Sequence, residues 1–545
     1  MTSTSARTTG PRLADVVANR VLRRLPPPTT GYTVRREQIP MRDGVLLRAD
    51  HYQPTGEVAG TLLVRCPYGR GFPFALVFAR MYAARGYRVI LQSVRGTFGS
   101  GGVFEPMANE AADGADTVAW LRTQPWFTGA FGTIGLSYLG FTQWSLLADP
   151  PPELKAAVIT VGPHDLHQST WGVGSFSLND FLGWSHMMAH QEDRPRIRAG
   201  LRQLTAQRRV RRAAAELPLG SAGRKLLGDG AGWYESWVEH PEADAFWDRL
   251  RYPVALEQTS VPVLLLGGWQ DLFLDQSLAQ FRALRDRGAE VALTVGPWTH
   301  TEMLTKGLQT VTGESLAWLG THLAGSGGPP RTSRVRTYVT GGPGWREMPD
   351  WPPQTADRSW WLQPGEGLSE TPLPGDAADS VCFTYDPADP TPTVGGRLLA
   401  PGGGYQRDDK LARRADVLAF TGAALTDDVT VFGSPVVELA HSSDTPYVDV
   451  FVRVSEVDAR GRSRNVSDGY RRLENACGTV RIELDEIAHR FAAGSRIRLL
   501  IAGGNHPRYA RNLGTGEPAI SGAAMRTATH TVRLAGSRLL LPADR

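Results

Sequence analysis

The stretch Gly132-Thr133-Ile134-Gly135-Leu136-Ser137-Tyr138-Leu139-Gly140 decides how this sequence folds. Apolar residues flank Gly135 as they would in a short buried strand, and apolar residues recur at helical spacing over residues 139–148. A serine between strand and helix, with small residues around it, is typical of a nucleophile elbow. The usual elbow has glycine two residues on each side of the serine, whereas here the downstream glycine, Gly140, stands three residues after Ser137. Because a structural turn with a capping serine has the same local pattern, the remaining sequence has to decide between the two.

Composition indicates a globular protein of several domains. Among the 545 residues, 41% are hydrophobic and 21% are charged, which allows for ample core. The cysteines are three, far apart and odd in number, and this excludes a disulfide framework and a cysteine-rich zinc site.

Charge is concentrated at the N-terminus. Residues 1–36 hold seven arginines and one acidic residue, which gives +6, so the other residues sum to about −2 of the net +4. The body of the protein therefore gives no reason to expect a nucleic-acid partner. A helix predicted at residues 13–22 either contacts an anionic surface or packs on the body, and we favour packing. Without a long apolar run or a signal-peptide pattern, we expect a soluble cytoplasmic protein with no transmembrane segment.

Strands alternate with helices over the first part of the chain. After a predicted hairpin, short buried strands are separated by helical segments, which indicates a parallel sheet covered on both faces. The hairpin is predicted over 34–39 and 46–52, the later strands over 61–66, 88–92 and 156–161, and the helices over 75–85 and 113–122.

This alternation stops near residue 166 and resumes at residue 261. Residues 175–250 contain no strand-like run and indicate several helices, inserted into one α/β domain as a cap. Arginines concentrated over 193–212 indicate either a basic groove or, as we favour, a solvated insertion. Beyond residue 330, short alternating strands indicate an all-β sandwich or jelly roll. The expected division is a basic N-terminal tail and helix (1–30), the first part of the core (31–164), the helical cap (165–250), the second part of the core (251–325) and the jelly roll (331–545).

Two loops after the cap supply the partners that a nucleophilic serine needs. Such a serine requires a base, and the base requires an orienting carboxylate. The predicted strand 261–268 is followed by Asp271, and the strand 291–295 is followed by His300, in the chain order of α/β-hydrolases. Both loops should meet the Ser137 loop at one edge of the sheet. Ser137, Asp271 and His300 are therefore the predicted catalytic triad.

Three other residues compete for these roles. Asp275 also follows the strand 261–268, but it precedes a helical pattern and is expected to cap that helix. His164 and His167 follow an earlier strand, before the cap, in the wrong order for the base. We expect them to line the junction with the cap.

Four motifs together resemble one known family. Residues 135–140 (Gly-Leu-Ser-Tyr-Leu-Gly), 67–69 (Pro-Tyr-Gly), 268–271 (Gly-Trp-Gln-Asp) and 296–300 (Gly-Pro-Trp-Thr-His) resemble the cocaine esterase and X-Pro dipeptidyl-peptidase family. That family also includes α-amino acid ester hydrolases and glutaryl acylases, and its elbow, Gly-x-Ser-Tyr-x-Gly, accounts for the displaced glycine. The resemblance covers nearly the whole chain, although Ser93 stands where the family commonly has Asp.

The resemblance implies an α/β-hydrolase core with an inserted helical cap and a C-terminal all-β jelly-roll domain. It also implies an oxyanion hole formed by the backbone N–H of Tyr138 and the phenol of Tyr68, although a core tyrosine at a strand end would look the same as Tyr68. Trp171, Phe273 and Trp298 are candidate walls of the substrate pocket, with plain core packing as the alternative.

The expected activity is acyl transfer by a serine hydrolase that forms an acyl-enzyme. No metal or organic cofactor is implied, and the expected substrates are small esters, amides or short peptides. The alternative is an X-Pro dipeptidyl-peptidase, which would need an acidic anchor for the substrate amine such as Asp165, Asp180 or Glu192. A second alternative is a non-enzymatic binding protein that retains the fold, which an intact triad argues against. A homo-oligomer is compatible with the sequence.

Overall fold

The computed structural model describes residues 7–8, 25–193, 196–326, 331–375, 379–399, 401–475 and 477–544. The helix predicted at residues 13–22 lies outside this part of the chain. Two compact units are present. The first contains the chain up to Leu166 with residues 245–268 and 276–335, and the second contains residues 167–244, 269–275 and the chain from Arg336 onward.

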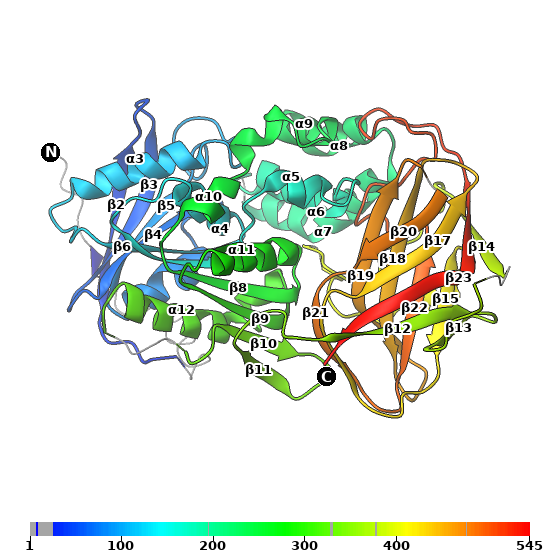
Figure 1. Ribbon diagram of the computed structural model, residues 1–545. Coiled ribbons are helices and arrows are strands. Elements are labelled where there is room, and N and C mark those ends of the chain that lie inside the picture. The colour runs from blue at the N-terminus through cyan, green and yellow to red at the C-terminus, as the bar shows by residue number, and fades with distance from the viewer. Residues whose placement is uncertain are drawn as a thin grey trace. The chain divides into compact units, whose positions relative to one another are not determined.

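A twisted sheet organises the first unit. Its strands follow the order β1-β2-β3-β5-β4-β6-β7-β8-β9 (Figure 1). β2 and β3 form an antiparallel hairpin, and β5, β4, β6, β7 and β8 run parallel. These parallel strands are apolar runs because helices cover both faces. The strands are β1 (Arg7–Thr8), β2 (Tyr32–Pro40), β3 (Leu46–Pro54), β4 (Gly60–Cys66), β5 (Tyr87–Ser93), β6 (Phe131–Leu136), β7 (Leu154–Thr160), β8 (Val263–Gln270) and β9 (Val291–Thr299).

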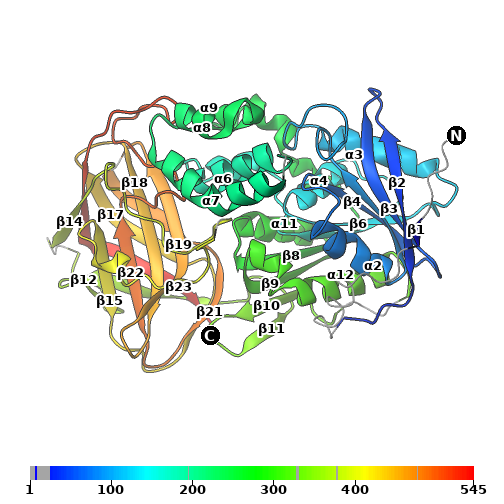
Figure 2. The same ribbon diagram turned by 180° about the vertical axis from the view of Figure 1, so that it is seen from behind.

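Alternate residues of β6 show which helices cover which face. Thr133 donates a 2.8 Å hydrogen bond to Gln143 of α4, whereas Gly132 faces Leu319 of α12. Accordingly α3 and α4 lie on one face (Figure 1) and α2 and α12 on the other (Figure 2). The helices of this unit are the π-helix η1 (Leu76–Arg80), α2 (Met81–Ala83), α3 (Glu110–Arg122), α4 (Tyr138–Leu147), η3 (Ala245–Leu250), α10 (Pro253–Gln258), α11 (Leu274–Asp286), η4 (Thr301–Leu304) and α12 (Leu308–His322).

Connections between neighbouring parallel strands bring their carboxyl ends to one edge of the sheet. β6 reaches β7 through α4, and β8 reaches its neighbour β9 through α11, as strand-helix-strand crossovers. The predicted parallel sheet of an α/β-hydrolase core is thereby confirmed. Residues that follow β4, β6, β8 and β9 come at the edge where such folds bind their ligands.

Helices fill the stretch between β7 and β8, and most of them belong to the second unit. The backbone N–H of Asn179 donates to the carbonyl of Pro507 at 2.9 Å, and that of Ala510 donates to Phe176 at 2.8 Å. The helical stretch is therefore hydrogen-bonded to the C-terminal part of the chain. These helices are α5 (Leu166–Trp171), α6 (Leu178–His190), α7 (Arg196–Ala215), α8 (Leu219–Leu227), η2 (Gly228–Ala231) and α9 (Trp233–Glu239).

The C-terminal part is all-β, as predicted. Its strands pair mostly antiparallel, and the long β23 pairs with β12, β14, β16 and β17 (Figure 2). Alternate residues of β17 and β18, among them Val437 and Val452, meet in one apolar core, as in a sandwich. The strands of this sheet are β12 (Ala356–Gln363), β13 (Gly367–Ser369), β14 (Ser380–Tyr385), β15 (Val417–Gly422), β16 (Val429–Gly433), β17 (Val436–Ser443), β18 (Val448–Val457), β19 (Ser463–Leu473), β20 (Cys477–Glu483), β21 (Ile487–Phe491), β22 (Arg496–Ala502) and β23 (Ala528–Ala543), and a 3-10 turn, η5 (Leu411–Arg413), precedes β15. Two short strands that come earlier in the chain, β10 (Val335–Val339) and β11 (Gly344–Met348), are not part of this sheet.

Among the described residues, none of the helices is both long enough and apolar enough to span a bilayer.

Candidate active site

Ser137 occupies a strained turn between β6 and α4. Its backbone has φ 62° and ψ −120°, in the left-handed half of conformational space that residues with a Cβ rarely adopt. The turn is tied to the sheet by a 2.9 Å hydrogen bond from the Ser137 N–H to the carbonyl of Thr160. The Ser137 carbonyl in turn accepts from the N–H groups of Gly140 and Phe141 at 2.8 and 3.1 Å. A strained serine at a strand-to-helix turn is the geometry of a nucleophile elbow rather than of an ordinary helix cap.

Glycine is required on both sides of this turn. A Cβ on Gly135 would lie 2.4 Å from the Cβ of Leu139, so the strand and the first turn of α4 touch there. A Cβ on Gly140 would lie 2.5 Å from the Cα of Gly162, at the end of the next strand. Both glycines are therefore fixed by backbone packing, and the three-residue spacing after Ser137 follows from where α4 meets Gly162.

The buried ion pair of Glu110 and Arg65 holds the side chain of Tyr138, the residue after Ser137. The phenol of Tyr138 donates to Glu110 at 2.7 Å and accepts from the N–H of Met107 at 2.8 Å. Glu110 in turn forms a 2.8 Å ion pair with Arg65, and both side chains are buried. Burial raises the pKa of Glu110, and burial together with the Glu110 charge raises the pKa of Tyr138. The Tyr138 side chain is thus an anchor for the elbow, and only its backbone N–H is directed by the turn itself.

Tyr68 lies next to the elbow. It comes two residues after β4 and is half-buried, with its ring stacked on Phe74 at 5.1 Å between centroids. Its edge meets the ring of Tyr138 at 6.5 Å. Tyr68 and Tyr138, which sequence reasoning assigned to one oxyanion hole, are therefore neighbours.

His300 and Asp271 directly follow their strands. β9 ends at Thr299, so His300 is the first residue after it, and Asp271 is the first residue after β8. Both side chains are buried, His300 to 4% exposure and Asp271 completely. One carboxylate oxygen of Asp271 accepts from the N–H of Phe273 at 2.8 Å, which fixes the side chain in its turn.

The competing residues have other partners. The helix α11 begins at Leu274, so the expectation that Asp275 caps it is wrong: Asp275 lies within the first turn. Its carboxylate instead forms two hydrogen bonds with Arg397, at 2.6 and 2.8 Å. His164 contacts Gln280 at 3.1 Å, and burial lowers the pKa of its imidazole to about 4. His167 contacts the carbonyl of Pro241 at 2.8 Å.

The three candidate pocket residues are buried aromatic side chains. The indole of Trp171 donates to the carbonyl of Trp237 at 2.8 Å. Trp298 packs against Gly296 and Gly307, where a Cβ would meet the indole ring. Phe273 is 7% exposed in the loop after Asp271.

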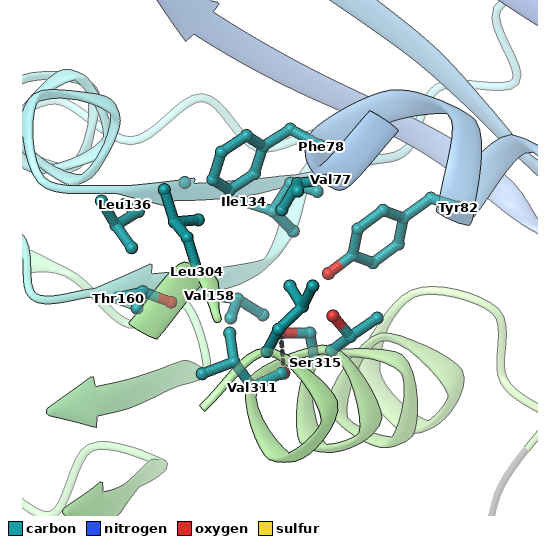
Figure 3. Close-up of a pocket in the computed structure, with 13 residues that line it drawn as sticks. Val77, Phe78, Tyr82, Ile134, Leu136, Val158, Thr160, Leu304, Val311 and Ser315 are labelled. Atoms are coloured by element: carbon teal, nitrogen blue, oxygen red, sulfur yellow. Dashed lines mark hydrogen bonds between the residues drawn. The ribbon is translucent and has the colours of Figure 1, made fainter. Parts of the chain in front are cut away.

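An apolar hollow lies behind the elbow, on the α12 face of the sheet. Ile134 and Leu136 form one side, Phe78 another and Val311 a third (Figure 3). The hydroxyl-bearing side chains of Tyr82 and Ser315 line the hollow as well, together with Thr160 and Thr312. Because its lining is mostly apolar and includes no carboxylate, imidazole or amine, we assign the hollow to the packing behind Ser137.

Comparison with known proteins identifies the family. Residues 43–302 match the X-Pro dipeptidyl-peptidase (S15 family), and residues 328–539 match the X-Pro dipeptidyl-peptidase C-terminal non-catalytic domain. The cocaine esterase of Rhodococcus sp. (strain MB1 Bresler) is 33% identical over 538 residues, which cover 88% of this chain and 92% of the esterase. The chain belongs to this family. It is a serine hydrolase, and the resemblance seen in the sequence motifs is confirmed.

Two solved structures share the fold. An aminopeptidase from the marine sediment archaeon Thaumarchaeota archaeon has a TM-score of 0.81 at 24% identity, over 94% of this chain and 96% of the aminopeptidase. An α-amino acid ester hydrolase has a TM-score of 0.78 at 22% identity, over 94% and 97% of the two chains. These similarities show the combination of α/β-hydrolase core and C-terminal all-β domain.

Sequence reasoning missed two buried charged residues that contact Tyr138 and Asp275 from distant parts of the sequence. Glu110 supports Tyr138 from 28 residues away, and Arg397 contacts Asp275 from 122 residues away. Neither lies in a motif, and charged residues of this kind are usually solvated. Only the folded arrangement singles them out, because both are buried.

Proposed function

We propose that this serine hydrolase cleaves esters or amides of small acyl substrates, with Ser137 as nucleophile, His300 as base and Asp271 as the carboxylate that orients His300. The observation that carries the proposal is the strained left-handed backbone of Ser137 at the β6–α4 turn. Such strain persists only where the surrounding structure enforces it, and Gly135 and Gly140 provide the space that it needs.

The reaction proceeds through an acyl-enzyme. His300 accepts the hydroxyl proton of Ser137 as the oxygen attacks the substrate carbonyl, and it then returns this proton to the leaving group. Water, deprotonated by the same imidazole, releases the acid. Asp271 holds the imidazole in the correct tautomer and stabilises its protonated form.

Negative charge on the substrate oxygen is stabilised by two donors. The N–H of Tyr138 follows the nucleophile directly, as the oxyanion-hole donor of α/β-hydrolases does. The phenol of Tyr68 is the second donor, supported by the contact between its ring and that of Tyr138. Each such donor typically contributes a factor of about 10²–10³ to the rate.

For the substrate class, we favour esters and amides over Xaa-Pro peptides. A dipeptidyl-peptidase needs a carboxylate that binds the substrate's N-terminal amine. Asp180, one of the three acids considered for this role, is buried and accepts hydrogen bonds from the N–H of Leu399 at 2.9 Å and from Asn179 at 3.1 Å. The 33% identity to a cocaine esterase also supports ester cleavage.

A fluorophosphonate probe and a substrate panel test this proposal. We expect the probe to label the wild-type protein and to leave Ser137→Ala unlabelled. Aryl esters and anilides should be hydrolysed faster than Xaa-Pro anilides at equal concentration. Labelling of both proteins would show that Ser137 is not the nucleophile, and a clear preference for Xaa-Pro anilides would assign the protein to the dipeptidyl-peptidases.

A further inference from the structure

The loop that carries Asp271 packs with the β-sandwich part of the chain. Residues 269–275 run from the last two residues of β8 into the start of α11, and they belong to the same compact unit as the chain from Arg336 onward. Asp271 is the third residue of this seven-residue segment. Its surroundings within that unit therefore determine where its carboxylate is held.

The segment is fixed on the side that precedes Asp271. Trp269 is completely buried, and its indole donates to the carbonyl of Tyr338 at 2.8 Å. The same ring packs against Trp351 at 5.1 Å between centroids. The side chain of Gln270 is buried as well.

The segment is also fixed on the side that follows Asp271, by an arginine from the β part. Arg397 donates from both terminal nitrogens to the two carboxylate oxygens of Asp275, at 2.6 and 2.8 Å. Its guanidinium also lies 2.6 Å from Asp485, and the side chain is only 7% exposed. A planar guanidinium can engage two carboxylates in a fixed geometry, which a lysine ammonium cannot do.

Arg397 is itself held in a rigid buried group. The N–H of Asp485 donates to the carbonyl of Asp468 at 2.8 Å. The carboxylate of Asp468 accepts two hydrogen bonds from Arg453, at 2.7 and 2.8 Å, and one from Arg508 at 3.1 Å. Burying so many charges is costly and is weak evidence for a stabilising role, so a role in fixing position is the better explanation.

Asp275 connects Arg397 to Asp271 through the start of α11. Asp275 is the second residue of that helix. The N–H of Phe273 donates to the Asp271 carboxylate, and the N–H of Leu274 donates to its carbonyl at 3.2 Å. A shift of the first helical turn would therefore move the groups that orient the Asp271 side chain.

We propose that Arg397 is a positioning residue for catalysis: by holding Asp275 it fixes the start of α11 and keeps the Asp271 carboxylate in the place where it orients His300. This inference rests on the proposed function, in which Asp271 is the acid of the triad. The β-sandwich part of the chain thereby contributes to the chemistry through one buried arginine.

The test uses the full-length chain with Arg397→Lys and Arg397→Gln and an activated aryl ester. Because misplacing a reacting group by about 1 Å can cost 10²-fold, we expect kcat to fall about tenfold for Lys and about 10²-fold for Gln, with KM changed much less. The acidic limb of the kcat/KM profile should also move to lower pH, because a displaced Asp271 stabilises the protonated imidazole less. A general loss of folding would lower activity at every pH without moving that limb.

Three further variants make the result decisive. Asp275→Asn removes the same ion pair by changing a half-exposed side chain. We expect a three- to tenfold lower kcat and the same shift of the acidic limb, because one charge-assisted pair is weakened. It decides the question if the Arg397 variants do not fold. Arg472→Lys is the matched control, because Arg472 makes an equivalent pair with Asp449 at 2.8 and 2.9 Å elsewhere in the sandwich, and it should keep the wild-type kcat and profile.

Asp271→Asn, measured in parallel, separates the two proposals. Full activity in this variant would overturn the triad assignment itself. An inactive Asp271→Asn, together with wild-type kcat and an unshifted profile in Arg397→Lys and Asp275→Asn, would leave the triad intact and overturn the positioning role of Arg397.

Discussion

Gly140 and Gly162 touch backbone to backbone: a Cβ on Gly140 would lie 2.5 Å from the Cα of Gly162, and a Cβ on Gly162 would lie 2.7 Å from the Cα of Gly140. Helix α4 therefore meets the end of β7 without any side chain between them. This approach sets the direction in which α4 leaves Ser137, and with it the direction of the Tyr138 N–H. The glycine three residues after the serine thus serves the elbow as directly as the glycine before it.

Gly140→Ala should damage both the fold and the activity. The added methyl group would overlap backbone atoms that cannot rotate away, so we expect a loss of about 1–3 kcal/mol in the free energy of unfolding. The displaced helix should also lower kcat. Urea denaturation and ester hydrolysis measure the two effects. Gly230→Ala is the control, since a Cβ there meets nothing within 4 Å, and equal stability of the two variants would contradict the packing argument.

Strain at Ser137 predicts opposite effects on stability and activity. Holding a residue with a Cβ in this conformation costs about 1–3 kcal/mol, and a glycine in the same conformation avoids this cost. The glycine lowers the free energy of unfolding by up to about 1 kcal/mol in turn, because the unfolded chain gains conformational freedom. We therefore expect Ser137→Gly to be inactive and to unfold at a higher temperature than wild type. Ser137→Ala should be equally inactive with an unchanged midpoint, because it keeps the strain. A lower midpoint for Ser137→Gly would show that the turn is not strained.

Much of the fold follows from the sequence because it depends on local patterns. Apolar runs and turn residues predicted β4 within one residue and located β8 and β9, which end two and four residues later than predicted. A parallel sheet brings the carboxyl ends of its strands to one edge by topology alone. The elbow could be predicted for the same reason, since its glycines lie within five residues of each other.

Partners distant in sequence could not be predicted in this way. The apolar spacing of α11 correctly indicated a helix near Asp275. Because helix boundaries are uncertain by a residue or two in such predictions, Asp275, which was expected to cap the helix, lies in its first turn. Its partner, Arg397, follows a glycine-rich turn 122 residues later and carries no local signal. A charged residue looks the same in sequence whether water or a buried carboxylate surrounds it.

Tyr68 and Tyr138 should respond differently to loss of the phenol oxygen, although their rings are in contact. Tyr68→Phe removes a proposed oxyanion donor, so kcat should fall about 10²–10³-fold with a smaller change in KM. Tyr138→Phe keeps the backbone N–H and removes only the bonds to Glu110 and Met107, so we expect a kcat within about tenfold of wild type and a stability loss of about 1–3 kcal/mol. Steady-state kinetics and thermal unfolding distinguish the pair. Equal kinetic losses, or a Tyr68 effect confined to KM, would remove Tyr68 from the oxyanion hole.

Buried histidines predict a loss of stability in mild acid. Burial lowers the pKa to about 4 for His51, His164, His441 and His506. Below an unfolded pKa of about 6.5 the unfolded chain binds protons that the folded chain does not. The stabilising effect of the neutral histidines is therefore complete above about pH 6.5 and declines as the pH falls toward 4.

His441 offers the sharpest test of this decline. Its Nε2 lies 3.0 Å from the Nδ1 of His530 inside the sandwich, an arrangement that needs one ring to donate and the other to accept, so the two rings cannot both be protonated while it persists. His441→Gln can still donate an amide N–H to His530 but no longer titrates. We expect its free energy of unfolding, measured with urea between pH 7 and 4.5, to fall less steeply than that of wild type, by up to about 1.4 kcal/mol per pH unit. Parallel slopes for the two proteins would mean that His441 does not change protonation on unfolding, and that carboxyl groups cause the acid sensitivity.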